Sequence, residues 1–318
     1  MNEFQLIERF FSPLGQTDNE LFVTGNGDDC TVLTLPAGAS LCCSIDTMVE
    51  GVHFLKGAPA DRLAYRSLAG AMSDLAAMGA SPAFFTLALT LPEVNEAWLA
   101  RFAAGLKKLV DAYNFPLLGG DTTKGPLCIS IQVHGLLYAA PLLRSGAQAG
   151  DIIAVSGTLG DAGAALSLLE KFNMKSSGLS QEEQYLLERY YSPSPRIALG
   201  QALLSCASSC IDISDGLLAE AAHIAKASSV ALSLDSDKLP VSSELLFLKG
   251  KERARELALS AGDDYELLFT LAPEKWEVLV AGVPELRLSQ IGVVQAGEGV
   301  FLDGLRAQNL LKGYQHFE

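Results

Sequence analysis

The sequence predicts an α+β protein built from two α/β domains that meet near residue 145. Its 318 residues exceed what a single core usually organises, which favours two domains. Segments with the two-residue period of strands alternate along the chain with segments of helical period. This pattern restarts after a linker-like stretch at 146–151. We therefore expect residues 1–145 to form an N-terminal domain and residues 146–318 a C-terminal one.

The N-terminal half opens with a predicted strand over 41–46 that ends at Asp46. Its alternation places Leu41, Cys43 and Ile45 on one face and Cys42, Ser44 and Asp46 on the other. Apolar residues at the 3.6-residue period predict a helix over 61–78, with Gly79 as its stop signal. The remaining elements are a strand at 84–91, a helix at 96–113, the pair Leu117-Leu118 leading into Gly119-Gly120-Asp121, and a strand at 127–137.

The C-terminal half alternates in the same way. A strand at 152–155 runs into a glycine-rich turn, Ser156 to Gly160, and a helix that we expect Asp161 to cap. The turn lacks the lysine of a P-loop and one glycine of a dinucleotide-binding loop, so it is interpreted as structural. The remaining predicted elements are a rigid connector at 192–195, helices at 196–205, 216–227 and 273–280, and strands at 211–213 and 265–271.

The composition excludes several classes of partner. A formal net charge of −14 disfavours nucleic acid and anionic membranes. An apolar fraction of 49% argues against disorder, and no apolar run is long enough to span a bilayer. The first residues lack the pattern of a signal peptide, and the six cysteines form no C-x-x-C pair. We expect a cytoplasmic protein with reduced, mostly buried thiols.

Six short acidic segments, each pairing Asp with Gly or Ser, are the most informative feature. Most of them follow apolar strands, where carboxylates from separate segments can meet. Oxygen ligands in such numbers suit Mg²⁺, which commonly accompanies a substrate phosphate. The segments are Gly27-Asp28-Asp29, Ser44-Ile45-Asp46, Ser73-Asp74, Gly119-Gly120-Asp121, Asp212-Ile213-Ser214-Asp215 and Gly262-Asp263-Asp264.

Each segment also has a plainer interpretation. Gly27-Asp28-Asp29 is equally well explained as a tight turn. Asp74 lies near the end of an apolar helix, where the helix dipole disfavours an anion. Its small neighbours Ser67, Gly70 and Ser73 leave room for a bound group, so a ligand role is preferred over a solvated surface position. Ser214 or Asp215 would serve as a helix N-cap. Two oxygen ligands on one face of a strand, Asp212 and Ser214, exceed what a cap needs.

Taken in order, these motifs resemble those of the thiamine-monophosphate kinase family, within the aminoimidazole-ribonucleotide-synthetase-like superfamily. The resemblance covers nearly the whole chain, and the ordered set is far more specific than any single motif. The matching segments are Gly25 to Asp29, Asp46 to Phe54, Ser73 to Ala80, Gly119 to Thr123, Ile211 to Gly216, Gly262 to Glu266 and Gly313 to Phe317.

The resemblance implies ATP-dependent phosphorylation of thiamine monophosphate to thiamine diphosphate. It also implies a homodimer formed through the N-terminal sheet, and an active-site cleft between the domains with several Mg²⁺ ions. By motif match, the metal ligands would be Asp29, Ser44, Asp46, Asp74, Asp121, Asp212 and Asp215, with the backbone of Ile45 as an addition. ATP would contact Gly120, Asp121, Arg144 and Ser214, and the acceptor would contact His53 and Asp263. A C-terminal aromatic residue of the family aligns with Leu311, and the nearest aromatic residue here is Tyr314.

This chemistry needs no general base. The acceptor is a phosphate monoester whose second pKa is about 6, so its oxygen is already ionised at neutral pH. The acidic motifs indeed contain no nucleophile–base pair. The barrier is repulsion between two polyanions, which bound cations and Arg144 would reduce during direct in-line transfer.

Two alternatives remain open at this stage. One is a sibling ATP-dependent enzyme of the same superfamily, catalysing purine-ring cyclisation or selenophosphate synthesis. The latter is disfavoured because Cys30 only follows the Asp pair and no Cys–Lys arrangement is present near the N-terminus. The other is a non-catalytic, metal-dependent nucleotide-binding protein.

Overall fold

The computed structural model describes residues 2–15, 21–24, 29–169, 171 and 178–307. It has the mixed α/β composition that the sequence predicts. The chain divides into two compact units. Unit 1 comprises Met1–Leu75 with Ala80–Ala139, and unit 2 comprises Ala76–Gly79 with Ala140–Glu318.

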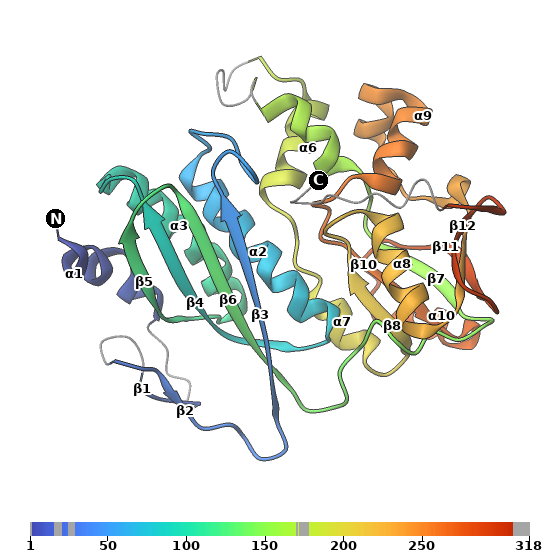
Figure 1. The fold of residues 1–318 in the computed structure, drawn as a ribbon, viewed down its shortest axis with the longest axis horizontal. Coiled ribbons are helices and arrows are strands. Elements are labelled where there is room, and N and C mark those ends of the chain that lie inside the picture. The colour runs from blue at the N-terminus through green and yellow to red at the C-terminus, as the bar shows by residue number, and fades with distance from the viewer. Residues whose placement is uncertain (1, 16–20, 25–28, 170, 172–177, 308–318) are drawn as a thin grey trace. The chain divides into compact units, whose positions relative to one another are not determined.

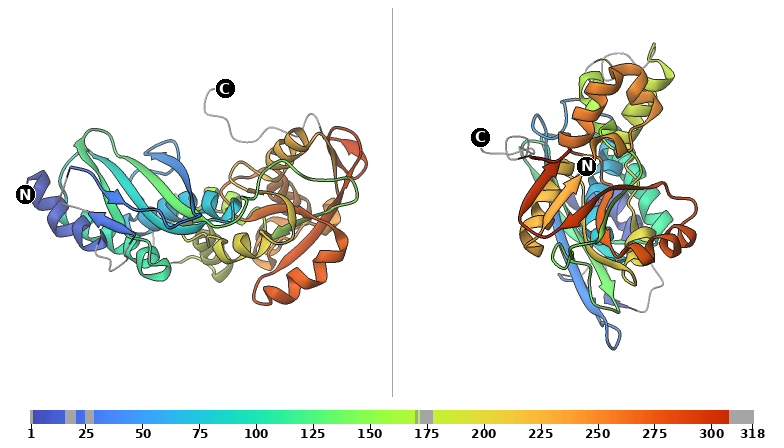
Figure 2. Two further views of the ribbon diagram at one scale, coloured as in Figure 1. Left: turned by 90° about the horizontal axis from the view of Figure 1, so that it is seen from below. Right: turned by 90° about the vertical axis from the view of Figure 1, so that its right-hand side faces the viewer.

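Unit 1 is a four-stranded sheet with two long helices on one face (Figures 1 and 2). The strands lie in the order β3 (Ser40–Val49), β6 (Cys128–Leu137), β4 (Ser81–Leu91) and β5 (Leu117–Lys124). β4 and β5 are parallel and the other pairs antiparallel. The helices are α2 (Ala60–Ala77) and α3 (Glu96–Tyr113). They cover the sheet with apolar side chains such as Leu68, Leu75 and Phe102, which are fully buried.

Strand β3 alternates as predicted, with its polar side toward the interior. Cys42, Ser44 and Asp46 are half-buried, whereas Leu41 and Ile45 are 39% and 62% exposed. The predicted end at Asp46 is wrong, because pairing with β6 continues to Val49, opposite Cys128. Asp46 therefore lies inside a rigid strand and not at a turn.

The glycine-rich segment before Asp121 is also part of a strand. We expected Gly119 to Asp121 to follow a strand, but β5 continues through them to Lys124. Gly120 has φ of 153°, and a Cβ there would lie 1.9 Å from the carbonyl oxygen of Leu87. Only glycine permits this close approach to β4, at a point where the pairing register shifts.

The N-terminal residues of unit 1 form elements that the sequence analysis did not predict. They are α1 (Glu3–Leu6), the helical turns Ile7–Phe11 and Ser12–Gly15, and the short hairpin of β1 (Phe22–Thr24) and β2 (Val32–Leu33). Leu21 packs with Phe84 and Leu118 in a small apolar cluster joined by Phe22 and Leu33. The ring of Phe84 also stacks on His134 at 4.1 Å between centroids. The hairpin is thereby anchored to the sheet.

Unit 2 contains a seven-stranded, mainly antiparallel sheet (Figure 1). Its order is β13 (Leu305–Arg306), β12 (Gly299–Leu302), β9 (Ala231–Leu234), β11 (Leu288–Gln295), β7 (Ile152–Ser156), β10 (Leu267–Leu271) and β8 (Ala207–Asp212). The helices are α4 (Asp161–Ala165), α6 (Gln181–Tyr191), α7 (Ile197–Leu203), α8 (Leu217–Ser228), α9 (Ser243–Ser260) and α10 (Trp276–Gly282), with short 3-10 turns at Leu166–Leu168, Ser236–Lys238 and Pro273–Lys275. The sequence analysis missed α6, α9, β9 and β11 to β13.

The start of α4 differs from the prediction. Gly160, not Asp161, is the N-cap residue, and glycine has no side chain that could cap the helix. The carboxylate of Asp264 accepts instead from the backbone N–H of Gly160 at 2.7 Å. Asp161 accepts from the hydroxyls of Thr158 and Ser242. The cap comes from a residue about a hundred positions away, which local patterns do not reveal.

Two other expectations concern the environment of the chain. No helix in the described part of the chain has the length and apolarity needed to cross a bilayer. All six cysteines are free thiols, but the expectation that most are buried is wrong. Cys210 alone is buried, while Cys30 and Cys43 are exposed.

Candidate active site

The first candidate group lies where β3 meets α2. The hydroxyl of Ser44 donates to Oδ2 of Asp74 at 2.5 Å. The pKa of Asp46 is raised to about 6, mainly by burial and further by the nearby charge of Asp74. Two carboxylates and a hydroxyl thus share one half-buried region, an arrangement that a bound cation would stabilise.

Small residues on α2 make this arrangement possible. The hydroxyl of Ser67 contacts the carbonyl oxygen of Leu63 (2.8 Å) and the sulfur of Met48 (3.3 Å). It is therefore directed to these atoms and not to the carboxylates of Asp46 and Asp74. Ser73 is fully buried. The predicted ligand role of Asp74 is consistent with its contact to Ser44. Ile45 faces the opposite side of β3, where its side chain is 62% exposed, so any contribution toward Asp74 would come from its backbone.

A second group lines a cavity of about 620 Å³ in unit 1. Asp29, Gly120 and Asp121 all contribute to its wall, together with the hydroxyl-bearing residues Thr31 and Thr86. Its apolar lining includes Phe4, Ile7, Phe11 and Leu117. A cavity of this size with one apolar and one polar side suits a ligand with a ring at one end and charged groups at the other.

Two threonines of this cavity, Thr31 and Thr86, were missed by the sequence analysis. The hydroxyl of Thr31 donates to the carbonyl oxygen of Leu118, which ties the segment after Asp29 to β5. Thr86 lies on β4 next to Gly119, with its methyl group 3.7 Å from where a Cβ would stand. Both positions become visible only through strand pairing, so no sequence signal identified them.

His53 lies in the turn after β3. Its Nδ1 accepts the backbone N–H of Val49 at 3.0 Å, which fixes the ring and leaves Nε2 as the other polar edge. The side chain is half-buried.

The corresponding acids of unit 2 follow β8. Asp212 is the last residue of β8 and is buried, whereas Asp215 is exposed. The N-cap alternative is wrong, because Gly216 occupies the N-cap position of α8 and no side chain caps the helix. Instead the Ser214 hydroxyl and the backbone N–H of Asp215 donate to Glu220, at 3.5 and 3.3 Å.

Glu220 is a further acidic residue that the sequence analysis missed. Burial and the charge of Asp215 raise its pKa to about 7, and Arg144 opposes this shift. A signal was present, because Glu220 shares the apolar face of α8 with Leu217, Ala221 and Ile224. A charged residue on such a face indicates a polar neighbour.

The Gly262-to-Glu266 segment holds Asp263 in an unusual backbone conformation. Asp263 and Tyr265 have φ of 69° and 51°, in the left-handed region. The backbone N–H of Asp263 donates to the carbonyl oxygen of Ser214 at 2.8 Å, and the Tyr265 hydroxyl donates to its carboxylate at 3.3 Å. β10 begins at Leu267, two residues later than the predicted strand at 265–271, so Asp263 lies in the segment that precedes it.

The other two acids of that segment belong to the interior. Glu266 receives hydrogen bonds from Arg196 (2.6 Å from Nε and from Nη2), Arg189 (2.9 Å) and the hydroxyl of Ser156 (2.5 Å). Asp264 is fully buried, and burial raises its pKa. Gly157 must be glycine, because a Cβ would lie 2.1 Å from Glu266 Oε1. These contacts hold Asp263 in place.

The structure therefore gathers the predicted residues in four places. One place holds Ser44, Asp46 and Asp74, and one cavity is lined by Asp29, Gly120 and Asp121. In unit 2, the backbone of Ser214 accepts a hydrogen bond from that of Asp263. The charges of Arg144 and Asp215 both shift the pKa of Glu220, in opposite directions. Among the described residues no three His, Cys, Asp or Glu side chains form a complete metal site. Asp28, Leu311 and Tyr314 lie outside the described residues.

Comparison with known proteins identifies the family of both halves of the chain. Residues 27–137 match the N-terminal domain, and residues 148–304 the C-terminal domain, of AIR synthase related proteins. The thiamine-monophosphate kinase of Salmonella typhimurium is 43% identical over 322 residues, covering 99% of this chain and 98% of that protein.

Solved structures give the same result. The thiamine-monophosphate kinase of Stenotrophomonas maltophilia superposes with a TM-score of 0.88 at 41% identity, covering 96% of this chain and 98% of the other. A structure described as AaThiL complexed with AMPPCP and TMP gives a TM-score of 0.81 at 34% identity, with coverage of 99% and 97%. Both matches extend over nearly the whole chain and so include both units, and the chain belongs to the thiamine-monophosphate kinase family.

Proposed function

We propose that this protein transfers the γ-phosphoryl group of ATP to thiamine monophosphate and so forms thiamine diphosphate. The observation that carries the proposal is the pairing of Asp46 and Asp74, with the Ser44 hydroxyl, on one half-buried face of unit 1. Such a pair is costly unless a cation neutralises it. The family relative solved with AMPPCP and TMP supports the choice of donor and acceptor.

Magnesium fits the residues that the structure shows. Mg²⁺ usually takes one or two carboxylates and completes its shell with water and substrate phosphates. Ser44, Asp46 and Asp74 provide too few ligands for an all-protein metal site, and such a partial set is what Mg²⁺ coordination of this kind requires. When bound, several Mg²⁺ ions would neutralise the phosphates and align them. Further ligands in the proposal are Asp29, Asp121, Asp212, Asp215 and the backbone of Ile45.

The protein groups have separate tasks in this proposal. Gly120 and Asp121 hold the donor phosphates, with the ring of ATP in the cavity they line. Arg144 and Ser214 add a cation and a hydroxyl for the same ligand. His53 and Asp263 hold the acceptor, whose cationic ring favours a carboxylate, and Leu311 would contact it as well. No residue serves as a general base, because the acceptor oxygen is already ionised at neutral pH.

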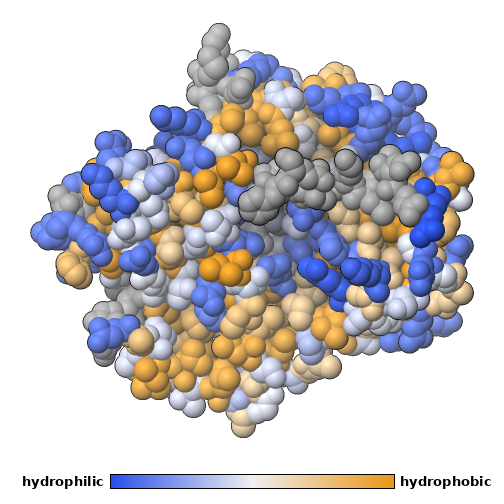
Figure 3. All heavy atoms as spheres, viewed as in Figure 1, coloured by the Kyte–Doolittle hydropathy of each residue, from blue (hydrophilic) through white to orange (hydrophobic). Residues whose placement is uncertain are grey.

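The assembly proposed is a cytoplasmic homodimer with residues 1–145 and 146–318 as its domains and the active-site cleft between them. Val23, Val32, Leu41 and Ile45 expose apolar surface on β1 to β3. Figure 3 shows hydrophobic side chains gathered over the part of the surface where these strands lie. Burial of that surface against a second copy would explain its composition. A monomer in sedimentation at micromolar concentration would contradict the dimer.

The direct test is a coupled assay of ATP consumption with and without thiamine monophosphate. We expect ADP release to require the acceptor, and thiamine diphosphate to form in equal amount. Consumption of ATP with the acceptors of purine-ring cyclisation or selenophosphate synthesis would assign a sibling activity. Binding of ATP with no turnover on any acceptor would leave a nucleotide-binding protein.

A further inference from the structure

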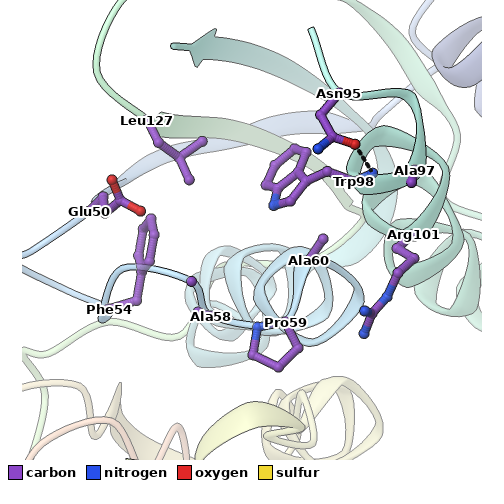
Figure 4. A pocket seen from close by; sticks show the side chains of 11 residues that line it. Glu50, Phe54, Ala58, Pro59, Ala60, Asn95, Ala97, Trp98, Arg101 and Leu127 are labelled. Atoms are coloured by element: carbon purple, nitrogen blue, oxygen red, sulfur yellow. Dashed lines mark hydrogen bonds between the residues drawn. The ribbon is translucent and has the colours of Figure 1, made fainter. Parts of the chain in front are cut away.

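A second cavity in unit 1 is lined by none of the residues assigned to the proposed phosphoryl transfer. Its volume is about 290 Å³, near the lower end of the roughly 300–1,000 Å³ typical of small-molecule sites. It lies among the turn after β3, the starts of α2 and α3, and the residue that precedes β6 (Figure 4). A ligand of about one ring system would fill it.

Two aromatic rings form opposite walls of this cavity. Phe54 and Trp98 face the space from either side, with Leu127 and the segment from Ala58 to Ala60 closing it (Figure 4). The indole of Trp98 stacks on Phe102, with 4.9 Å between ring centroids and 15° between planes. Phe54 is 4% exposed, and its carbonyl oxygen accepts from the N–H of Gly51 at 2.8 Å. The indole of Trp98 is therefore braced by Phe102, and Phe54 is anchored through its backbone with little of its surface exposed.

One carboxylate in the cavity wall is not neutralised by the protein. The backbone N–H of Glu50 donates to the carbonyl oxygen of Leu127 at 3.2 Å, which fixes the position of this residue. Within the part of the chain that the structure describes, its half-buried carboxylate makes no hydrogen bond or ion pair. A carboxylate in that setting favours a positive charge nearby.

The positively charged residue in the cavity wall, Arg101, is already paired with a carboxylate of the protein. Arg101 binds Oδ1 of Asp61 through Nη2 at 2.6 Å and Nε at 3.2 Å. Its guanidinium points away from the two rings (Figure 4). Among the residues that line the cavity, the carboxylate of Glu50 is therefore not neutralised by Arg101.

We propose that this cavity binds a planar aromatic cation, held between Phe54 and Trp98 and neutralised by Glu50. A cation between two aromatic faces is attracted by both rings, and more strongly when it is desolvated. A neutral ring would lose both that attraction and the attraction of Glu50, and an anion would be repelled. Thiazolium compounds belong to this ligand class, a link that rests on the proposed function.

Tryptophan fluorescence offers a direct readout. The chain has two tryptophans, Trp98 in the cavity and Trp276 in α10 of unit 2. In a Trp276→Phe protein, N-methylpyridinium chloride should quench Trp98 emission along a saturable curve, with matching heat in a calorimetric titration. Neutral pyridine at pH 8 should bind at least about tenfold more weakly, since it lacks the charge.

Matched variants separate a site from random collision. Glu50→Gln should weaken N-methylpyridinium binding about tenfold, and Phe54→Leu should also weaken it. Glu93→Gln makes the same chemical change at an exposed carboxylate outside the cavity and should bind within about twofold of the parent. Unchanged affinity in a Glu50→Gln protein with parental melting temperature would overturn the proposal, as would unsaturable quenching in the parent.

The kinase proposal is tested apart from this one. Thiamine, which carries no phosphate, should displace N-methylpyridinium from the parent and do so poorly in Glu50→Gln. Failure of displacement would remove thiazolium compounds from the ligand class. If the protein showed no kinase activity but bound N-methylpyridinium through Glu50, the proposed function would fail and the cation site would stand.

Discussion

The acidic segments of the two units resemble one another in sequence but differ in what surrounds their carboxylates. In unit 1, Asp46 and Asp74 lie close together, and burial with like charge raises the pKa of Asp46 to about 6. In unit 2, Glu266 is held by two arginines and Asp264 by a backbone N–H. The comparison shows that an Asp-rich segment indicates function only where the protein leaves part of the charge for a ligand.

The largest expected effect concerns Glu266, the acidic residue whose charge is neutralised by two arginines of the protein. Glu266→Ala should lower the free energy of unfolding by about 3–5 kcal/mol, because it leaves the largely buried side chains of Arg189 and Arg196 without their shared, fully buried partner. Denaturant unfolding followed by Trp276, which lies in unit 2, measures it. Glu256→Ala, which removes an exposed partner of Arg253, should cost under about 0.5 kcal/mol. Equal losses of unfolding free energy in Glu266→Ala and Glu256→Ala would contradict the stabilising role assigned to Glu266.

Asp46 and Asp121, whose carboxylates are proposed to bind a ligand, should matter for activity and not for stability. Asp46→Asn and Asp121→Asn should each lower kcat by at least about 100-fold, the scale of losing one preorganised electrostatic contact. The melting temperature of Asp46→Asn should not fall, because its charged form is disfavoured by burial and by Asp74. ATP should also bind poorly when Mg²⁺ is removed by a chelator.

Steady-state kinetics and calorimetry supply these measurements. Asp111→Asn, at an exposed carboxylate of α3 paired with Lys107, is the control and should retain parental activity. Near-normal turnover in both the Asp46 and Asp121 variants would remove the metal-binding proposal.

A smaller effect should distinguish the two ends of the proposed substrate. His53→Ala and Asp263→Ala should raise KM for thiamine monophosphate about tenfold while KM for ATP changes less than about twofold, the loss of one polar contact being worth about 1.4 kcal/mol. Initial rates with each substrate varied in turn provide both constants. Equal changes in the two KM values, or a melting temperature low enough to explain the lost activity, would assign both residues a purely structural role.

The smallest expected effect concerns a buried titratable group with no proposed ligand. Burial lowers the pKa of His134, so the unfolded chain binds its proton more readily than the folded protein does. Stability from this residue is complete above the unfolded pKa of about 6.5 and is lost as the pH falls toward the lower folded value. Urea unfolding at pH 5.5 and 7.5 should therefore show a smaller pH dependence for His134→Gln than for the parent. An identical dependence would contradict this assignment.

Much of the framework was predictable because it depends on local periodicity. The helix at 96–113 was predicted with its observed bounds, and the alternation of β3 correctly separated Ile45 from Ser44 and Asp46. The missed helices α6 and α9 show the limit of that method. In α9, Gly250 has non-helical dihedral angles that interrupt the element, and its apolar pattern is correspondingly weak.

The acidic segments, their order along the chain and the family they resemble follow from the sequence alone. Which side chains meet was decided by the tertiary structure. Ser44 reaches Asp74 across 30 residues, Glu266 collects Arg189 and Arg196 across about 70, and Asp264 caps a helix that begins about 100 residues earlier. Hydrogen bonding and charge compensation act over a few ångströms of space regardless of sequence separation. Periodicity therefore predicts the strands and helices, whereas the balance of charge at each carboxylate emerges only when distant segments pack together.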